Sequence, residues 1–133
     1  MSGQNPPSRR ETICVVALLL VFLVFNLLTA SRYPFVWIDE VMYSDPAFNL
    51  LLGHGFTSTA WYAQGAEEFW AGNVPLHSLL LFAWLKVSGI SITAVRGLNL
   101  FYIVGACLLI WRTCLRLNLV TIMRYRLLLL LLV

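Results

Sequence analysis

The chain has 133 residues, of which 60% are hydrophobic and 11% are charged, and its mean hydropathy is +0.82. A water-soluble domain with so few polar side chains could not cover its surface with them, so the composition excludes an ordinary soluble protein and indicates lipid as the main solvent. The basic residues behind the formal net charge of +3 are scattered along the chain, which argues against a nucleic-acid-binding surface.

The first predicted element is a membrane span over residues 12–30, which contain no charged side chain. A helix of this length covers about 28 Å, close to the ~30 Å hydrocarbon core of a bilayer. Arg9 and Arg10 precede the span, and this order predicts that residues 1–11 form a cytoplasmic tail. The alternative is a signal peptide cleaved near residues 28–31, but the apolar run is longer than a usual signal core and further apolar segments follow it.

Residues 31–93 are expected to lie on the extracytoplasmic side, and the part up to residue 74 holds five of the six acidic residues. Helical spacing of apolar side chains predicts two juxtamembrane helices there, at about 38–52 and 75–87. The dipeptide Asp45-Pro46 complicates the first helix, because an aspartate N-cap before a proline could restart it. Gly53 is expected to end it.

Aromatic side chains are frequent in the same stretch, and amphipathic rings suit the headgroup level of a membrane. An aromatic belt is therefore one interpretation, and a surface that stacks on sugars is the other. The rings concerned are Trp37, Trp61, Tyr62, Phe69 and Trp70.

The helix over 75–87 decides the topology, and its short length favours an interfacial position over a span. Residues 94–115 are then the second span, 116–126 a cytoplasmic loop, and 127–133 the start of a third span in a longer membrane protein. This arrangement places four arginines on the cytoplasmic side, as the positive-inside rule favours, whereas a crossing helix would place them outside. They are Arg112, Arg116, Arg124 and Arg126.

The three cysteines lie in or beside the predicted spans and are interpreted as small buried hydrophobic residues. Their spacing relative to the histidines predicts no metal site.

Several short motifs follow one another in a recognisable order. Asp39-Glu40 and Tyr43 come after the first span, and the run AFNLLLGHGF follows at 47–56. Pro75-Leu76 then leads into LLLFAWLKVSG at 79–89, and Ala94-Val95-Arg96 precedes the second span. This order resembles the opening of the membrane glycosyltransferases of the GT-C fold, in the branch related to dolichyl-phosphate-mannose protein mannosyltransferases and bacterial lipid A aminoarabinose transferases.

The resemblance covers about residues 12–116 and implies an all-α, polytopic enzyme of the cell membrane with extracytoplasmic juxtamembrane helices. Such enzymes transfer a sugar from a polyprenyl-phosphate donor to an acceptor at the extracytoplasmic face. In the aminoarabinose-transferase pattern a lysine stands just before this proline. The present chain departs from that pattern, because it has Asn73-Val74-Pro75 instead. Phosphate binding at this position is therefore in question.

The resemblance assigns the catalytic carboxylate to Asp39. A carboxylate within hydrogen-bond reach could take the acceptor proton, and it could also help to hold a divalent cation. Glu40 points about 100° away on a helix, so the two acids are not expected to serve one proton. Glu40 is a substrate-binding candidate, or else a surface charge that faces headgroups or an arginine.

The remaining substrate-binding candidates are Tyr43, on the same helical stripe as Asp39, and His54, which could instead be a simple turn residue. Lys86 and Arg96 could meet the donor phosphate, although interfacial cations are common in membrane proteins. Glu67-Glu68 could contact the acceptor or a metal, or could be solvated loop charges.

Two other functions stay open at the level of the sequence. One is a non-catalytic membrane protein whose loop binds a partner or a lipid-linked glycan, and the other is a secreted product with its mature start near Ser31. The expected ligands are the polyprenyl-phosphate sugar donor and membrane lipid, with no nucleic acid.

Overall fold

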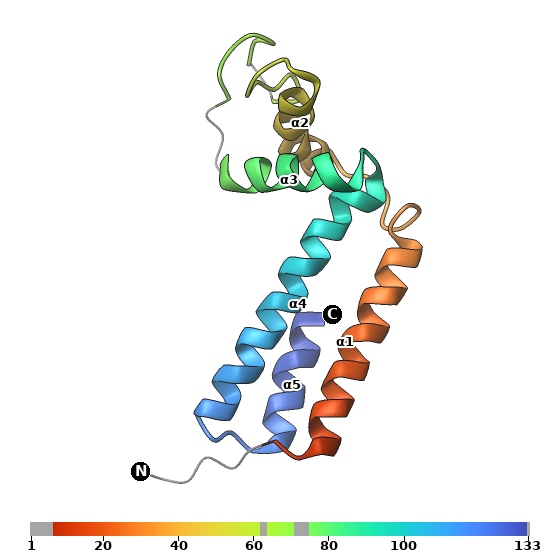
Figure 1. The fold of residues 1–133 in the computed structure, drawn as a ribbon, viewed down its shortest axis with the longest axis vertical. Coiled ribbons are helices and arrows are strands. Elements are labelled where there is room, and N and C mark those ends of the chain that lie inside the picture. Colours follow the sequence, from red (N-terminus) through yellow and green to blue (C-terminus); the bar gives the residue numbers. More distant parts are fainter. Residues whose placement is uncertain (1–6, 62–63, 71–74, 133) are drawn as a thin grey trace. The chain divides into compact units, whose positions relative to one another are not determined.

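A computed structural model describes residues 7–61, 64–70 and 75–132. Within these residues the chain forms five α-helices and no strand, so the predicted all-α class is confirmed for the described part (Figure 1). The chain divides into two compact units. Unit 1 comprises residues 1–28 and 99–133, and unit 2 comprises residues 29–98.

Unit 1 contains most of α1 (Arg9–Thr29), the larger part of α4 (Ile92–Arg116) and all of α5 (Thr121–Leu132). Its core is apolar and takes residues from all three helices, namely Val15, Leu19, Cys107, Trp111 and Leu128. Cys107 and Cys114 are buried, as predicted, but Cys14 is exposed.

Two helices of the described chain are long and apolar enough to cross a membrane, α1 with a mean hydropathy of 2.7 and α4 with 1.7. Only 11% of an apolar 18-residue stretch of α1 and 28% of the corresponding stretch of α4 are buried inside the protein. Most of their apolar side chains are therefore not covered by other parts of the described chain. That pattern differs from the core helix of a soluble protein, whose apolar side chains pack against other elements.

The helix ends of unit 1 differ from the expected bounds for identifiable reasons. α1 begins at Arg9 because the hydroxyl of Ser8 accepts a hydrogen bond from the backbone N–H of Glu11 at 3.1 Å, which caps the helix. α5 begins at Thr121, so the connection expected over 116–126 is shorter. Arginines are good helix formers, and Arg124 and Arg126 do not interrupt the helix.

In unit 2, α2 (Ile38–Leu52) has the bounds expected from the sequence. It runs through Pro46 without restarting, so the alternative in which Asp45 caps a second helix is wrong. Proline has no N–H to offer the carbonyl of Met42, four residues earlier. The indole N–H of Trp61 donates to that carbonyl oxygen instead, at 2.8 Å, and this bond helps to explain why the helix tolerates the proline.

α2 ends at Gly53, as the sequence predicted. Gly53 adopts a left-handed conformation with φ 85°, and the N–H of His54 donates to the carbonyl of Asn49 at 2.9 Å.

The next helix, α3 (Pro75–Ser88), packs against α2. The core of unit 2 lies between them and the start of α4, with Ala47, Leu81, Leu85, Ala94 and Val95 buried. A 14-residue helix is about 21 Å long, which is short for a bilayer. α4 begins at Ile92 because the hydroxyl of Ser91 accepts a hydrogen bond from the N–H of Ala94 at 3.0 Å.

The described parts of the loop between α2 and α3 fold back on themselves. Thr57 and Phe69 form an antiparallel bridge, and the N–H of Trp70 donates to the carbonyl of Phe56 at 2.8 Å. The ring of Trp70 is only 1% exposed and packs edge-on against Phe56. Trp70 therefore supports the loop from inside and is available neither to a membrane belt nor to a stacked sugar. Tyr62, Asn73 and Val74 lie outside the described residues.

Candidate functional site

The adjacent acids Asp39 and Glu40 occupy the first turn of α2 and have different surroundings. Carboxylates suit this position because the N-terminus of a helix bears a partial positive charge. The Glu40 side chain is 23% exposed, and both of its oxygens accept hydrogen bonds from the guanidinium of Arg96. The distances are 2.6 Å from Nε to Oε1 and 2.7 Å from Nη2 to Oε2. The pair is therefore bidentate, which is the strong geometry for arginine and carboxylate.

The third nitrogen of Arg96 completes a clamp. Its Nη1 donates to the carbonyl of Ala30 at 2.6 Å, so one side chain joins the segment after α1, the first turn of α2 and the second turn of α4. The prediction that Arg96 meets a donor phosphate stays untested, but such a contact would have to replace bonds that the residue makes here. For Glu40, the interpretation as an arginine-facing charge describes its position in this structure.

Asp39 is exposed, and no hydrogen bond or ion pair of its side chain occurs among the described residues. Its backbone is nevertheless held, because the clamp on Glu40 fixes the neighbouring residue. The arrangement thus presents one free carboxylate on a fixed helix end. Such a group can accept a proton from a bound hydroxyl if that hydroxyl comes within hydrogen-bond reach.

The other predicted site residues are distributed over unit 2. Tyr43 packs edge-on against Trp61, with ring centroids 5.4 Å apart, and its carbonyl accepts a hydrogen bond from Ser78. Lys86 is exposed and places its ammonium 4.4 Å from the centre of the Phe82 ring. Both residues therefore have visible structural contacts.

His54 lies at the opposite end of α2 from Asp39, just after the terminal Gly53. It lines a cavity together with Glu67, which comes from the following loop. The structure thus brings together His54 and Glu67, which the sequence analysis considered as separate candidates. Neither residue lies at the Asp39 end of α2.

Asp45 is the residue whose role the sequence did not reveal. One oxygen of its carboxylate accepts hydrogen bonds from the Ser58 hydroxyl at 2.7 Å, the Thr59 N–H at 2.9 Å and the Ala60 N–H at 3.2 Å. It therefore ties the loop to α2. The only signal in the sequence was the run Thr57-Ser58-Thr59, which is rich in donors but does not point to a partner 13 residues away.

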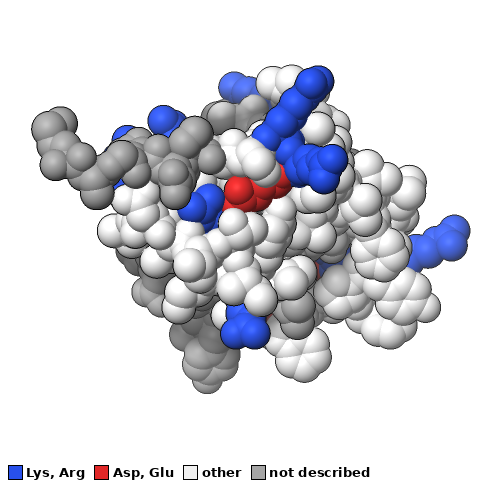
Figure 2. All heavy atoms as spheres, turned by 90° about the horizontal axis from the view of Figure 1, so that it is seen from below, with Lys and Arg blue, Asp and Glu red and all other residues white. Residues whose placement is uncertain are grey.

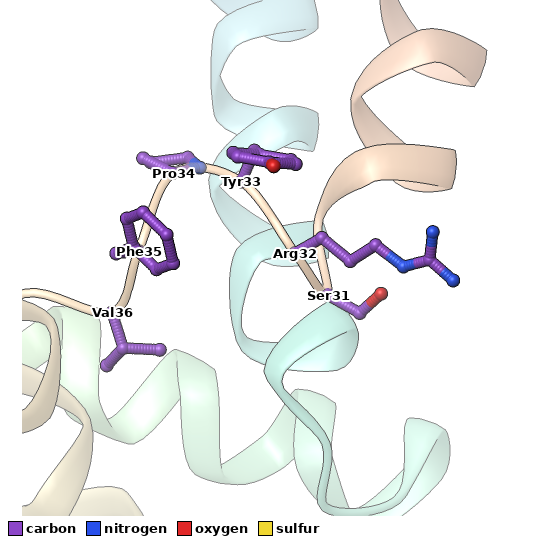
Figure 3. Close-up of a pocket in the computed structure, with 6 residues that line it drawn as sticks. All are labelled: Ser31, Arg32, Tyr33, Pro34, Phe35 and Val36. Atoms are coloured by element: carbon purple, nitrogen blue, oxygen red, sulfur yellow. The ribbon is translucent and has the colours of Figure 1, made fainter.

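The segment between α1 and α2 forms a second cavity, of about 410 Å³, lined by Ser31, Arg32, Tyr33, Pro34, Phe35 and Val36. Figure 3 shows the Arg32 side chain extending to the same side as Ser31 and away from Phe35 and Val36. The guanidinium of Arg32 has no hydrogen bond or ion pair within the described chain, in contrast to Arg96. Phe35 is 82% exposed and Trp37 is 70% exposed.

Charge is distributed unequally over the two units. Unit 1 contains six arginines and one glutamate, whereas unit 2 contains three basic and five acidic residues. The start of α1, the end of α4 and the start of α5 lie at the same end of unit 1 (Figure 1). All of its charged residues belong to these helix ends, and Figure 2, seen from below, shows Lys and Arg side chains around a small acidic area.

Glu11, the acid of unit 1, is buried and receives a hydrogen bond from Arg124 at 3.1 Å. Arg124 is buried as well and also donates to the carbonyl of Leu119 at 2.6 Å. The charge that unit 1 presents outward is therefore basic.

Within the described residues, no group of three or more His, Cys, Asp or Glu side chains could hold a metal ion. A divalent cation at Asp39 would therefore need most of its ligands from outside the described residues. Comparisons of the chain with protein-family models, curated proteins and solved structures found no match.

Proposed function

We propose that the chain belongs to an integral-membrane glycosyltransferase of GT-C type, which transfers a sugar from a polyprenyl-phosphate donor to an acceptor at the extracytoplasmic face of the cell membrane. The observation that supports this most is the contrast between two adjacent acids. Glu40 is engaged by Arg96 through two hydrogen bonds, while Asp39 is exposed and unpaired within the described chain.

Hydropathy and charge support the proposed membrane position. The apolar side chains of α1 and α4 are mostly uncovered, which is favourable if lipid surrounds them. With α1 and α4 as spans, the positive-inside rule assigns the arginines at 9–10 and 112–126 to the cytoplasmic side, and the chain order then assigns residues 31–93 to the extracytoplasmic side.

The proposed chemistry needs one base. The acceptor hydroxyl oxygen attacks the anomeric carbon of the donor sugar while its proton passes to the carboxylate of Asp39. The bond between the anomeric carbon and the phosphate oxygen breaks, and polyprenyl phosphate leaves with the electron pair. General-base catalysis of this kind typically contributes 10²- to 10⁴-fold in rate, which gives the scale for the test.

The leaving phosphate needs a cation near it. Arg96 is engaged by Glu40 and Ala30, whereas Arg32 and Lys86, the other basic residues of unit 2, form no ion pair within the described chain and could meet it. Arg32 lies three residues after the end of α1 and is followed by the exposed aromatic side chains of Tyr33 and Phe35, which suit the headgroup level.

The experiment compares Asp39→Asn with the wild type in the intact protein as its gene encodes it, in membranes supplied with polyprenyl-phosphate-linked sugars. The variant keeps the shape of the side chain but loses the base, so transfer should fall by about 100-fold or more. Glu68→Gln is the matched control, because it removes an exposed acid outside the proposed site. Wild-type turnover in Asp39→Asn, or no transfer by the wild type from any such donor, would contradict the proposal.

A non-catalytic glycan-binding membrane protein is the second candidate. The cavity lined by His54 and Glu67 favours this function, because a cavity apart from Asp39 could hold a glycan without taking part in transfer. This function predicts that ligand binding survives Asp39→Asn and that no sugar is transferred.

A further inference from the structure

The cavity at the end of α2 has a volume of about 360 Å³. It lies within unit 2, and its walls come from the last turn of α2, the residues after Gly53 and the folded loop. The lining residues are Asn49, His54, Thr57, Thr59, Ala66 and Glu67.

Hydrogen bonds hold the backbone around this cavity. The Asn49 amide donates to the carbonyl of Thr57 at 3.0 Å and so joins α2 to the loop. Asp45 accepts from the N–H of Thr59, and Thr57 is bridged to Phe69 on the other side of the loop. The frame is thus assembled before any ligand arrives, which lowers the entropic cost of binding.

Three polar side chains in the wall keep their hydrogen-bonding capacity. No hydrogen bond from another described residue reaches the His54 ring, the Thr59 hydroxyl or the Glu67 carboxylate. Glu68, the neighbour of Glu67, differs in this respect, because its carboxylate accepts a hydrogen bond from the N–H of Gly65 at 3.0 Å. The two adjacent glutamates therefore form a natural pair of test and control.

The chemistry of the wall selects one ligand class. Among the described residues that line it there is no lysine or arginine, which disfavours phosphate and other anions, and Ala66 is the one aliphatic residue of that set, which disfavours a lipid chain. A carboxylate, an imidazole, hydroxyls and an amide can together accept from and donate to several neighbouring hydroxyl groups. We infer that this cavity binds a sugar ring of a neutral glycan, with Glu67 accepting hydrogen bonds from adjacent hydroxyls.

The site is separate from the proposed base. Asp39 stands in the first turn of α2 and Asn49 in the last, and ten residues of helix span about 15 Å. The cavity would therefore recognise a sugar that does not react, in an acceptor or in an extended glycan. The inference does not depend on the proposed transfer, because it concerns binding alone.

The test measures binding of methyl glycosides to the full chain in detergent micelles by saturation-transfer NMR and calorimetry. The probes are methyl α-D-mannopyranoside, methyl α-D-glucopyranoside and methyl β-D-galactopyranoside, with inorganic phosphate and methylammonium as non-sugar probes. At least one glycoside should bind saturably, with a Kd of about 1 mM as a reasonable scale for a single ring.

Glu67→Gln and Thr59→Val should each weaken that binding by about tenfold, because each removes hydrogen bonds to the ligand. Glu68→Gln and Asp39→Asn should bind like the wild type, and circular dichroism should report an unchanged helix content for all four. The inference is overturned if no glycoside binds, if Glu67→Gln binds like the wild type, or if Glu68→Gln weakens binding as much as Glu67→Gln. Saturable binding of methylammonium or phosphate in place of the glycosides would also overturn it.

Discussion

The two units treat their acidic residues differently. Unit 1 has a single acid, Glu11, which is buried and bound to Arg124. Unit 2 has five acids, of which three have visible partners: Glu40 binds Arg96, Asp45 holds the loop, and Glu68 accepts from Gly65. Asp39 and Glu67 have none among the described side chains, and both are exposed.

The presence or absence of a partner separates the acids that support the fold from those that are available for chemistry. An acid that binds an arginine inside a helical unit supports the fold, and its removal should be seen in stability. An acid on a fixed backbone without a partner costs little to stability when it is replaced, so its effect should appear in binding or turnover.

Replacement of Arg124 by methionine should have the largest effect on stability. It leaves the Glu11 carboxylate buried without its partner, and breaking a buried pair in this way typically costs about 3–5 kcal/mol. Thermal unfolding of the variant in micelles would measure it. The double variant Glu11→Gln/Arg124→Met should recover most of the loss, and an unchanged unfolding temperature for Arg124→Met alone would show that the pair contributes nothing.

Replacement of Asp45 by alanine should release the loop at a cost of about 1–3 kcal/mol, because the donors of Ser58, Thr59 and Ala60 lose a shared acceptor. Hydrogen exchange at the amides of Thr59 and Ala60 would report the release directly. Asp39→Ala is the control on the same helix and should leave both amides protected. Equal exchange in the two variants would count against the anchoring role.

Replacement of Arg96 by lysine should cost about 1–2 kcal/mol, since an ammonium cannot reproduce two parallel hydrogen bonds to Glu40 and a third to Ala30. A double-mutant cycle with Glu40→Gln would isolate the coupling between the two side chains. The coupling free energy between the two side chains should be clearly larger than that of an exposed ion pair. A coupling near zero would show that the two side chains act independently.

The smallest effect concerns His77 in α3. Burial lowers the pKa of this histidine below its ordinary value of 6.5, so the folded chain binds its proton less readily than the unfolded chain. Its contribution to stability is therefore complete above pH 6.5 and declines as the pH falls through 6.5 toward the lower folded value. Unfolding at pH 7.5 and at pH 5.5 should show a slightly smaller acid loss for His77→Gln than for the wild type. An identical loss of stability in the two proteins would show that His77 does not contribute to the pH dependence.

The helices could be predicted from local patterns, and the reasons are visible in single residues. The bounds of α2 follow from its apolar spacing and from Gly53, both of which act within a few residues. The starts of α1 and α4 depended on single serine caps, Ser8 and Ser91, which shifted them by a few residues from the expected bounds. Local chemistry thus determined these helices to within a few residues, whereas α5 begins at Thr121, six residues before the expected start at 127.

The pairing of side chains could not be predicted in the same way. Glu40 and Arg96 are 56 residues apart, and Glu11 and Arg124 are 113 residues apart, so no local pattern joins them. A restart of α2 at Asp45-Pro46 was the alternative that the local pattern left open, and the distant Trp61 satisfies the carbonyl that the proline leaves free. His54 and Glu67 come to one cavity only because the loop folds back, a consequence of the Asp45 and Thr57 contacts.

Labelling of residue 39 in intact cells shows directly whether Asp39 faces the exterior. Asp39→Cys would be introduced into a variant in which Cys14, Cys107 and Cys114 are replaced by alanine, with Arg112→Cys as the opposite-side control. A membrane-impermeant maleimide should label position 39 in intact cells and position 112 only after permeabilisation. Labelling of position 39 only after permeabilisation would contradict an outward-facing acid, and with it the proposed transfer at that face.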